Sequence, residues 1–304
     1  MTCSADTPYP VIEIQPDWVM EGEVMGSKPK FWFRSSDGES NWLFKYPQPN
    51  TGQHWSEKIA AEVAGALGIP HARVELTVFR NERGSATESF ARNGRGLYHG
   101  NQVLAGRWLD YDPEKRFRQS NHTLENIFAA LDLLFASPDG RRRAKRRMAE
   151  YLVLDALIGN TDRHHENWGI LRKRTGDRWA GTVAPTFDHA SSLGRELLDE
   201  GAGKSRRRLL AEQQIPRYSE RAPGAIYWQP SDKRGISPLE LVRRASTRHE
   251  AVLRRALSRV DKLNESALQR IVKRVPEGWM SALSQTFAVD LMCYNLDQMR
   301  RIAP

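Results

Sequence analysis

The stretch GNTDRHHENWGIL (residues 159–171) places an Asp, an Arg, two His, a Glu and an Asn at consecutive positions, directly behind the apolar run YLVLDALI. A metal site, an acid/base pair on a catalytic loop and a solvated turn are the three alternatives. A zinc metalloprotease places two His four residues apart on a helix, with a Glu beside the first. His164 and His165 are adjacent, so a zinc site is not expected.

The spacing of Asp162 and Asn167 is more informative. An Asp, four intervening residues and an Asn form a phosphotransferase catalytic loop, because the carboxylate must meet the attacking hydroxyl while the amide oxygen reaches a magnesium ion on the nucleotide. The pair alone occurs by chance in many proteins. The hypothesis therefore depends on further residues that the fold must bring beside it.

A second carboxylate for the same ion is Asp188, in TFDHASSLG. The segments WGILRK and RWAGTVAPTF, joined by RTGD, predict a β-hairpin over residues 168–187. An antiparallel return brings the far end of a hairpin alongside its start, so Asp188 should lie beside Asn167. Taken alone, Asp188 would be interpreted as the cap of a turn with His189 and Ser191.

Positive charge for the phosphates would come from Lys45, which ends the apolar strand NWLFK. A lone Lys in such a place is usually a surface residue with a buried stem. Glu57 follows at the start of a predicted helix over residues 56–67, and a strand Lys paired with a helix Glu is the kinase arrangement. Glu at a helix start is also common for dipole reasons alone.

A turn that could cover phosphates should precede Lys45, and VMGSKPKFWF (residues 24–33) is the candidate. Gly26 permits close approach of the backbone, and Ser27, Lys28 and Lys30 surround it. The segment is neither a G-x-G-x-x-G loop nor a Walker motif, so its signal depends on its position ahead of the strand Lys.

The elements that must hold these residues change character along the chain. Up to residue 91 the pattern predicts a hairpin (30–35 and 41–47), the helix over 56–67, and a strand pair (73–79 and 85–91). From about residue 120 the apolar spacing is helical, and Ser237 with Pro238 marks one helix start. The segment 196–229 has weak periodicity and is interpreted as a loop.

These patterns predict an α+β protein with a small β-rich N-lobe (residues 1–91) and a larger, mainly α-helical C-lobe (92–304). The apolar stretches are too short for a membrane helix, and the N-terminus resembles no secretion signal, so the cytoplasm is the expected location and no membrane partner is expected. Only two cysteines occur, Cys3 and Cys293, which makes a disulfide framework improbable.

The formal charge of +9 is concentrated in RRRAKRR and KSRRR. Such runs are more often solvated faces than phosphate-binding patches, and no helix-turn-helix, zinc-finger or aromatic RNA-binding pattern accompanies them. Direct nucleic-acid binding therefore has support from charge alone.

Taken together, the motifs resemble those of the HipA family of serine/threonine kinases, toxins of bacterial toxin-antitoxin systems with a phosphatidylinositol kinase-like fold. The matching segments are GSKPK, FKYP, SEKIAAEVAGALGIP, ESFAR, GNTDRHHEN and TFDHASSLG, and they cover roughly residues 22–195. The resemblance implies a bilobal, protein-kinase-like fold and an enzyme that uses ATP and Mg²⁺ to phosphorylate a cytoplasmic, translation-related protein.

Carried over by position, the resemblance implies Asp162 as the catalytic base, and Asn167 and Asp188 as magnesium ligands. Lys45 would contact phosphate, held by Glu57. The other residues implied around the nucleotide are Gly26, Ser27, Lys28 and Lys30 in the phosphate loop, Glu88 and Phe90 at the hinge beside adenine, and His164, which either faces the cofactor or orients the loop.

The sequence departs from the family pattern at two places. Met25 stands where self-regulating members carry a phosphorylated serine, and Ser27 is the nearest substitute. Only about twenty residues precede the loop, too few for the N-terminal subdomain that contacts an antitoxin in full-length relatives. Possible partners are therefore an antitoxin or a separate protein that supplies this subdomain, with nucleic acid contacted only indirectly.

Two alternatives to the protein kinase stay open. A small-molecule or lipid phosphotransferase could use the same residues, because such a site serves any hydroxyl. A catalytically silent nucleic-acid-binding module could use the basic segments, and its affinity would fall steeply with salt.

Overall fold

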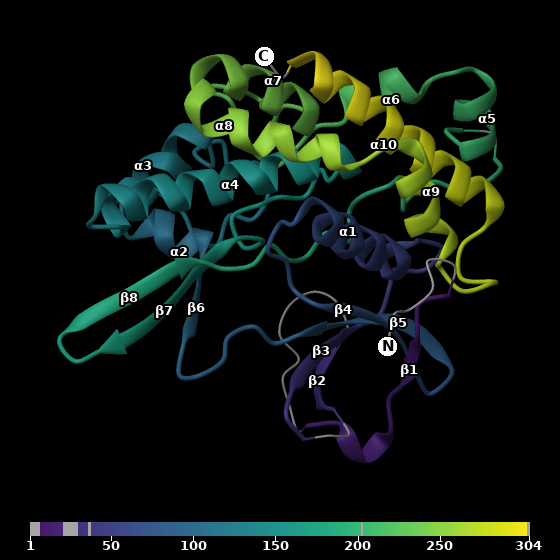
Figure 1. Cartoon of the computed structure of the whole chain (residues 1–304), viewed down its shortest axis with the longest axis horizontal. Helices are drawn as coiled ribbons and strands as arrows, with labels where there is room; N and C mark the ends of the chain where they lie inside the picture. The colour runs from purple at the N-terminus through teal and green to yellow at the C-terminus, as the bar shows by residue number, and fades with distance from the viewer. Residues whose placement is uncertain (1–6, 21–29, 36–37, 202, 303–304) are drawn as a thin grey trace.

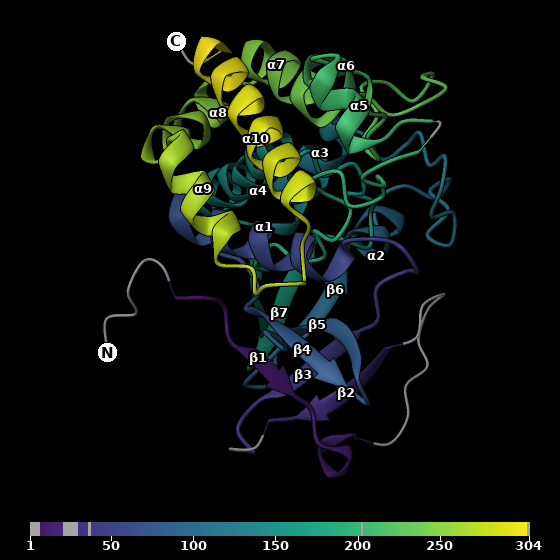
Figure 2. The ribbon, with the colours of Figure 1, turned by 90° about the vertical axis from the view of Figure 1, so that its right-hand side faces the viewer.

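The computed structural model describes residues 7–20, 30–35, 38–201 and 203–302. Figure 1 shows a β-sheet region with one helix, α1, between it and a larger helical region, and Figure 2 shows the same arrangement from the side. A main hydrophobic cluster runs through both regions, and it includes Leu76 of the sheet, Ile59 of α1 and Leu154 of the helical region. The predicted boundary at residue 91 stays a prediction.

A five-stranded sheet forms the smaller region. Its strand order is β1 (Val11–Glu13), β4 (Val74–Phe79), β5 (Glu82–Glu88), β3 (Asn41–Lys45) and β2 (Lys30–Arg34), and a short 3₁₀ helix, η1 (Pro16–Trp18), follows β1. β1 is parallel to β4 and the other neighbours are antiparallel. Both predicted strand pairs are confirmed. The second pair has a tighter turn than predicted, because Arg80 and Asn81 adopt positive φ and β5 begins directly after them.

The two faces of this sheet differ in chemistry because side chains alternate along a strand. Phe31, Phe33, Trp42 and Phe44 lie on one face and form an aromatic cluster with Phe79. Lys30 and Lys45 are cross-strand partners, so their side chains share the opposite face. The alternation of NWLFK therefore directs its Lys away from the aromatic cluster.

The helix α1 (Gln53–Leu67) begins three residues before the predicted start at residue 56. Ser56 is not the N-cap, since its hydroxyl donates to the carbonyl of Ser192 (3.0 Å). Gly52 occupies the cap, and an added Cβ there would lie 1.8 Å from the Trp55 ring, which requires glycine. The C-terminal end at Gly68 (φ 68°) is confirmed.

The helix α1 is packed into the larger region on its other side. Ile59, Val63 and Leu67 are fully buried, and all three belong to the main hydrophobic cluster. Arg259 donates to the carbonyl oxygens of Leu67 and Gly68, at 3.0 Å in both cases, and so binds the end of α1 to the helical region.

The predicted hairpin over residues 168–187 is confirmed as β7 (Gly169–Thr175) and β8 (Arg178–Val183). A third strand, β6 (Gly96–His99), pairs antiparallel with β7 and was not predicted. Figure 1 shows this small sheet projecting from the junction between the two regions, so that the start of β7 and the end of β8 lie near α1.

Helices make up most of the larger region. They are α2 (Gly100–Ala105), α3 (Leu124–Leu134), α4 (Pro138–Ile158), α5 (Arg206–Ala211), α6 (Ile215–Arg221), α7 (Pro238–Arg248), α8 (Glu250–Leu257), the 3₁₀ helix η2 (Ser258–Lys262), α9 (Glu265–Lys273) and α10 (Ala282–Ile302). The predicted helix start at Ser237 is confirmed by its hydroxyl, which accepts from the Glu240 amide. The segment 196–229 is not a simple loop, since it contains α5 and α6. Within the described chain, no helix has the length and apolar character that crossing a membrane requires.

Candidate active site

The catalytic-loop candidate begins where α4 ends. Gly159 caps this helix in the left-handed conformation (φ 65°), its amide donates to the carbonyl of Asp155, and the chain leaves the helix axis there. The side-chain amide of Asn160 donates to the Asp155 carboxylate (2.7 Å). The polar cluster that follows the apolar run is therefore anchored to the last turn of the helix.

Arg163 binds the loop from its buried side. Its guanidinium binds both carboxylate oxygens of Asp155 (2.7 Å each), and both side chains are 3% exposed. It also donates to the backbone carbonyls of Asn167 and Phe187. Burial acts against the charge on Arg163, but the adjacent carboxylate outweighs it, so the pKa of Arg163 is raised. The residue before Asp188 is thus fixed next to Asn167.

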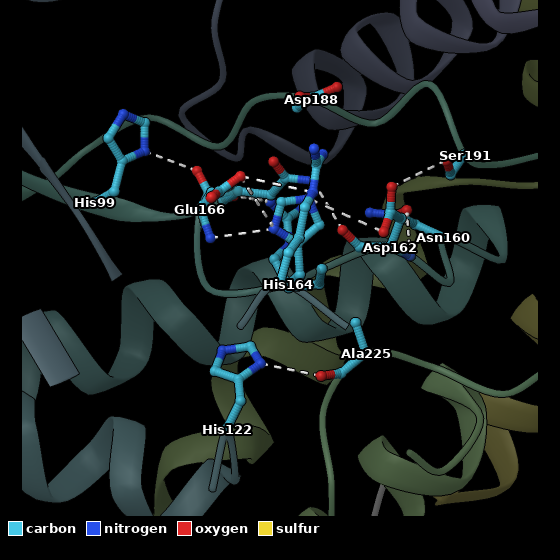
Figure 3. Close-up of polar contacts among 12 residues, drawn as sticks. His99, His122, Asn160, Asp162, His164, Glu166, Asp188, Ser191 and Ala225 are labelled. Carbon is cyan, nitrogen blue, oxygen red and sulfur yellow. Dashed lines mark hydrogen bonds and ion pairs between the residues drawn. The ribbon is translucent and has the colours of Figure 1, made fainter. Parts of the chain in front are cut away.

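Asp162 and Asn167 are hydrogen-bonded to each other within the loop. The Asn167 side-chain amide nitrogen donates to the backbone carbonyl of Asp162 (2.8 Å), which leaves the amide oxygen to accept elsewhere. Ser191 donates to the Asp162 carboxylate (3.3 Å), and Figure 3 shows these two side chains directed toward each other. The Asp162 side chain is 37% exposed, so a substrate hydroxyl can reach it.

Asp188 and Lys45 form an ion pair that joins the segment after β8 to the end of β3 (3.1 Å). Asp188 has φ 58°, in the left-handed region that few non-glycine residues adopt, although Asp and Asn do so more readily than most. Burial would lower the pKa of Lys45, but the carboxylates of Asp188 and then Glu57 outweigh it, so the pKa is raised. Lys45 therefore carries its charge over the whole physiological pH range.

Lys30 lies beside Lys45 as its cross-strand partner. Burial, followed by the neighbouring charge of Lys45, lowers the pKa of Lys30. Like charges directly opposite each other in a sheet are destabilising. An anion between the two ammonium groups would remove that repulsion, which fits a phosphate site.

The predicted ion pair between Lys45 and Glu57 is not what the structure shows. Lys45 is bound by Asp188, and the Glu57 carboxylate faces His189, with 3.4 Å between Oε1 and Nδ1. Glu57 lies in the second turn of α1, because the helix begins earlier than predicted, and it is 1% exposed. The negative charge of the Glu57 carboxylate still raises the pKa of Lys45, whose ion pair is with Asp188.

His164 is buried within the loop, and a cofactor-facing role for it stays a prediction. The side chain is 4% exposed, and Arg116 donates to its Nε2 (3.2 Å). Burial and then the Arg116 charge lower the pKa of His164 to about 3, so the ring is neutral at physiological pH. The structure places His164 within the loop, where it can orient the backbone.

The hinge candidates Glu88 and Phe90 lie at the end of β5. Glu88 forms an ion pair with Arg92. The Phe90 ring lies against Phe187, with centroids 5.3 Å apart, one residue from Asp188. The hinge candidate is therefore adjacent to Asp188, and its contact with adenine stays a prediction. Gly26, Ser27 and Lys28, like Met25, lie outside the described residues.

The donor set fits magnesium better than a transition metal. Asn167 and Asp188 offer oxygen ligands, which Mg²⁺ prefers, and Mg²⁺ usually keeps waters and binds nucleotide phosphates as its remaining ligands. In the part of the chain that the structure describes, no group of three or more His, Cys, Asp or Glu could hold a metal ion. A complete protein cage is thus not built, and two protein oxygens with a nucleotide are the arrangement that fits.

The sequence analysis missed the residues that position the site, above all Asp155, Arg163 and Arg116. Asp155 carried a signal, because a carboxylate in an otherwise apolar helix segment needs a buried partner. Arg163, in DRHHEN, was the nearest candidate for that buried partner. Arg116 lies 48 residues before His164, in a segment of weak periodicity, and no sequence pattern connected the two residues.

Comparison with known proteins places this geometry in a family. Residues 22–277 match the family described as HipA-like C-terminal domain. The serine/threonine-protein kinase CtkA of Helicobacter pylori (strain J99) is 27% identical over 182 residues, which span 54% of this chain and only 53%, about half, of that protein.

Two solved structures share the fold. The Helicobacter pylori proinflammatory kinase CtkA has a TM-score of 0.74 at 18% identity, covering 96% of this chain and 98% of that one. HipA of Shewanella oneidensis MR-1, solved with HipB and its operator DNA, has a TM-score of 0.60 at 15% identity, covering 92% and 65%. The predicted α+β, bilobal, kinase-like fold is confirmed, and the chain belongs to the family of HipA-like C-terminal domains.

Proposed function

We propose that this chain is an ATP- and magnesium-dependent serine/threonine protein kinase. One arrangement carries the proposal: Lys45 is paired with Asp188, Asn167 is bonded to Asp162, and Arg163 joins the backbones of the two segments. The kinase name of the curated Helicobacter pylori relative supports it. A basic side chain, two metal-type oxygen ligands and an accessible carboxylate are what phosphoryl transfer requires.

In the proposed reaction, the oxygen of a Ser or Thr hydroxyl attacks the γ-phosphorus of ATP, the bond to ADP breaks, and Asp162 accepts the hydroxyl proton. When bound, Mg²⁺ would supply positive charge that stabilises the transferring phosphoryl group. Asn167 and Asp188 would hold this ion, and Lys45 and Lys30 would contact the phosphates. The buried ion pair beneath the loop keeps these groups in position before substrate arrives.

The test is incubation of the purified chain with magnesium, γ-labelled ATP and a bacterial lysate. We expect labelled protein containing phosphoserine or phosphothreonine, and a decrease of roughly 10²–10⁴-fold in Asp162→Asn, since that is what a positioned general base contributes. Asp177→Asn is the matched control, because Asp177 is fully exposed in the turn between β7 and β8. Equal labelling by wild type and Asp162→Asn contradicts the proposal.

The same experiment separates the other phosphotransferases. Label that partitions into a lipid extract or a small-molecule fraction, with protein left unlabelled, would favour a lipid or small-molecule substrate on the same site. Binding to nucleic acid without any phosphotransfer would favour the silent binding module.

We further propose that the chain acts in the cytoplasm as the toxin of a toxin-antitoxin pair, on a translation-related protein. The support is the solved HipA, whose printed title names a toxin-antitoxin system with HipB and operator DNA. An antitoxin or a protein that supplies the N-terminal subdomain would be the partner. Growth arrest on expression, absent in Asp162→Asn and relieved by co-expression of such a partner, is the expected outcome. Growth unaffected by the wild-type chain contradicts the toxin role.

A further inference from the structure

A pocket of about 620 Å³ opens beside the catalytic loop, on the side of α5 and α6. Thr161 and Ser191 form its wall next to the loop. Because Ser191 donates to the Asp162 carboxylate (3.3 Å), this wall is one side chain away from the proposed catalytic base (Figure 3). Neither Lys45 nor Asp188 lines the pocket. It is therefore separate from the place where the phosphates would be held.

The pocket lining is strongly basic. Its cationic side chains are Arg195, Lys204, Arg208, Arg217 and Arg221, against the two carboxylates of Glu196 and Glu212. Glu212 is bound by Arg208 (2.8 Å), and Glu196 accepts from the Tyr218 hydroxyl (2.6 Å). The Glu212 charge is thus offset by Arg208, and the five cations still outnumber the two carboxylates of the lining.

Three cations of the lining stay available. Lys204, Arg217 and Arg221 are exposed, and within the described residues no ion pair involves them. Several unneutralised charges of one sign around a concave surface raise the local concentration of a ligand of the opposite sign. The pocket is therefore built for an anionic group.

We propose that this pocket binds an acidic segment, rich in Asp and Glu, of the protein substrate, next to the Ser or Thr that is phosphorylated. The inference rests on the proposed kinase function. A peptide bound there would pass the wall formed by Thr161 and Ser191 and present its hydroxyl to Asp162. Leu209 and Tyr218 give the same pocket an apolar surface for the peptide backbone and side-chain stems.

The test compares two synthetic peptide pools with a fixed central Ser or Thr, one flanked by Asp and Glu and the other by Lys and Arg, each with magnesium and ATP. We expect the acidic pool to be phosphorylated with a kcat/KM at least about tenfold higher, and the preference to weaken with added salt. Arg217→Glu with Arg221→Glu should lower kcat/KM for the acidic pool about tenfold or more.

Arg143→Glu with Arg234→Glu is the matched control, since it changes the charge equally at two exposed positions outside the pocket lining. It should keep the wild-type preference. If the double pocket variant does not fold, as judged by its melting curve, Lys204→Glu tests the same surface with one change.

Equal phosphorylation of both pools by the wild-type chain, or the same loss in the control as in the pocket variant, overturns the inference while leaving a kinase. Loss of single-stranded RNA binding in the pocket variant, with peptide phosphorylation unchanged, overturns it in favour of a nucleic-acid site. No labelling of peptides or lysate proteins by any variant is the separate result that counts against the proposed function itself.

Discussion

The two sides of the candidate active site are built in different ways. On the helical side, the loop with Asp162 and Asn167 is bonded to buried partners, of which the pair Asp155 and Arg163 is the centre. On the sheet side, Lys30 and Lys45 lie beside each other, partly exposed and with like charge. The helical side is therefore organised by buried pairs before a ligand arrives, whereas the sheet side holds two lysines against the one carboxylate of Asp188, and an anion would reduce the repulsion that remains.

The largest effect should come from breaking the organised side. Arg163→Met leaves the Asp155 carboxylate buried without its partner, and such a change costs about 3–5 kcal/mol of unfolding free energy. Unfolding in urea measures it. Arg234→Met, at an exposed position, is the control and should change the unfolding free energy by less than about 0.5 kcal/mol. Asp155→Leu combined with Arg163→Met should recover part of the loss. A single variant as stable as wild type would mean that the pair does not organise the loop.

A smaller effect tests the ligand-dependent side. Magnesium and ATP at about a hundred times the dissociation constant should raise the unfolding free energy by roughly 2.7 kcal/mol, seen as a melting shift of a few degrees. Asp188→Ala with Lys45→Ala should abolish the shift, because it removes a metal ligand and a phosphate contact. A shift of equal size in this variant contradicts the nucleotide site.

The smallest effect concerns pH. Since the pKa of Lys30 is lowered and that of Lys45 is raised, Lys30 loses its proton first as the pH rises. ATP affinity should then fall on the alkaline side by on the order of 0.2–1 kcal/mol, the range for a partly exposed charge contact. Calorimetric titration at a series of pH values measures it. Lys30→Arg keeps its charge and should not show the fall. Parallel curves for both proteins would exclude Lys30 from the phosphate site.

Much of this arrangement could be predicted from local patterns. The hairpin that returns the chain to Asn167 followed from alternation and a glycine turn, and the bond between Asn167 and Asp162 agrees with their spacing. The two strand pairs of the five-stranded sheet were predicted from the same kinds of pattern. In each case the residues that carry the prediction are close in sequence, so local backbone geometry determines which of them contact each other.

The errors arose where tertiary contacts decide. Glu57 was assigned to Lys45 because sequence order suggested it, but the buried His189 and the competing Asp188 come from a distant segment. Two roles stayed open for His164, because the Arg116 side chain that donates to it comes from a distant segment. Helix α1 began earlier than predicted because its cap uses Gly52 against the Trp55 ring, and no capping side chain marks that position.

The burial of α1 on both of its sides has a consequence for control of the proposed kinase. Swinging this helix outward would expose Ile59, Val63 and Leu67, each costing about 1.5–3 kcal/mol, and would break the bonds from Arg259 to its last turn. A regulator that works by displacing the helix would have to overcome that whole sum. Ligands that bind in a pocket of this molecule can therefore regulate it at a lower energetic cost than partners that must separate α1 from the helical region.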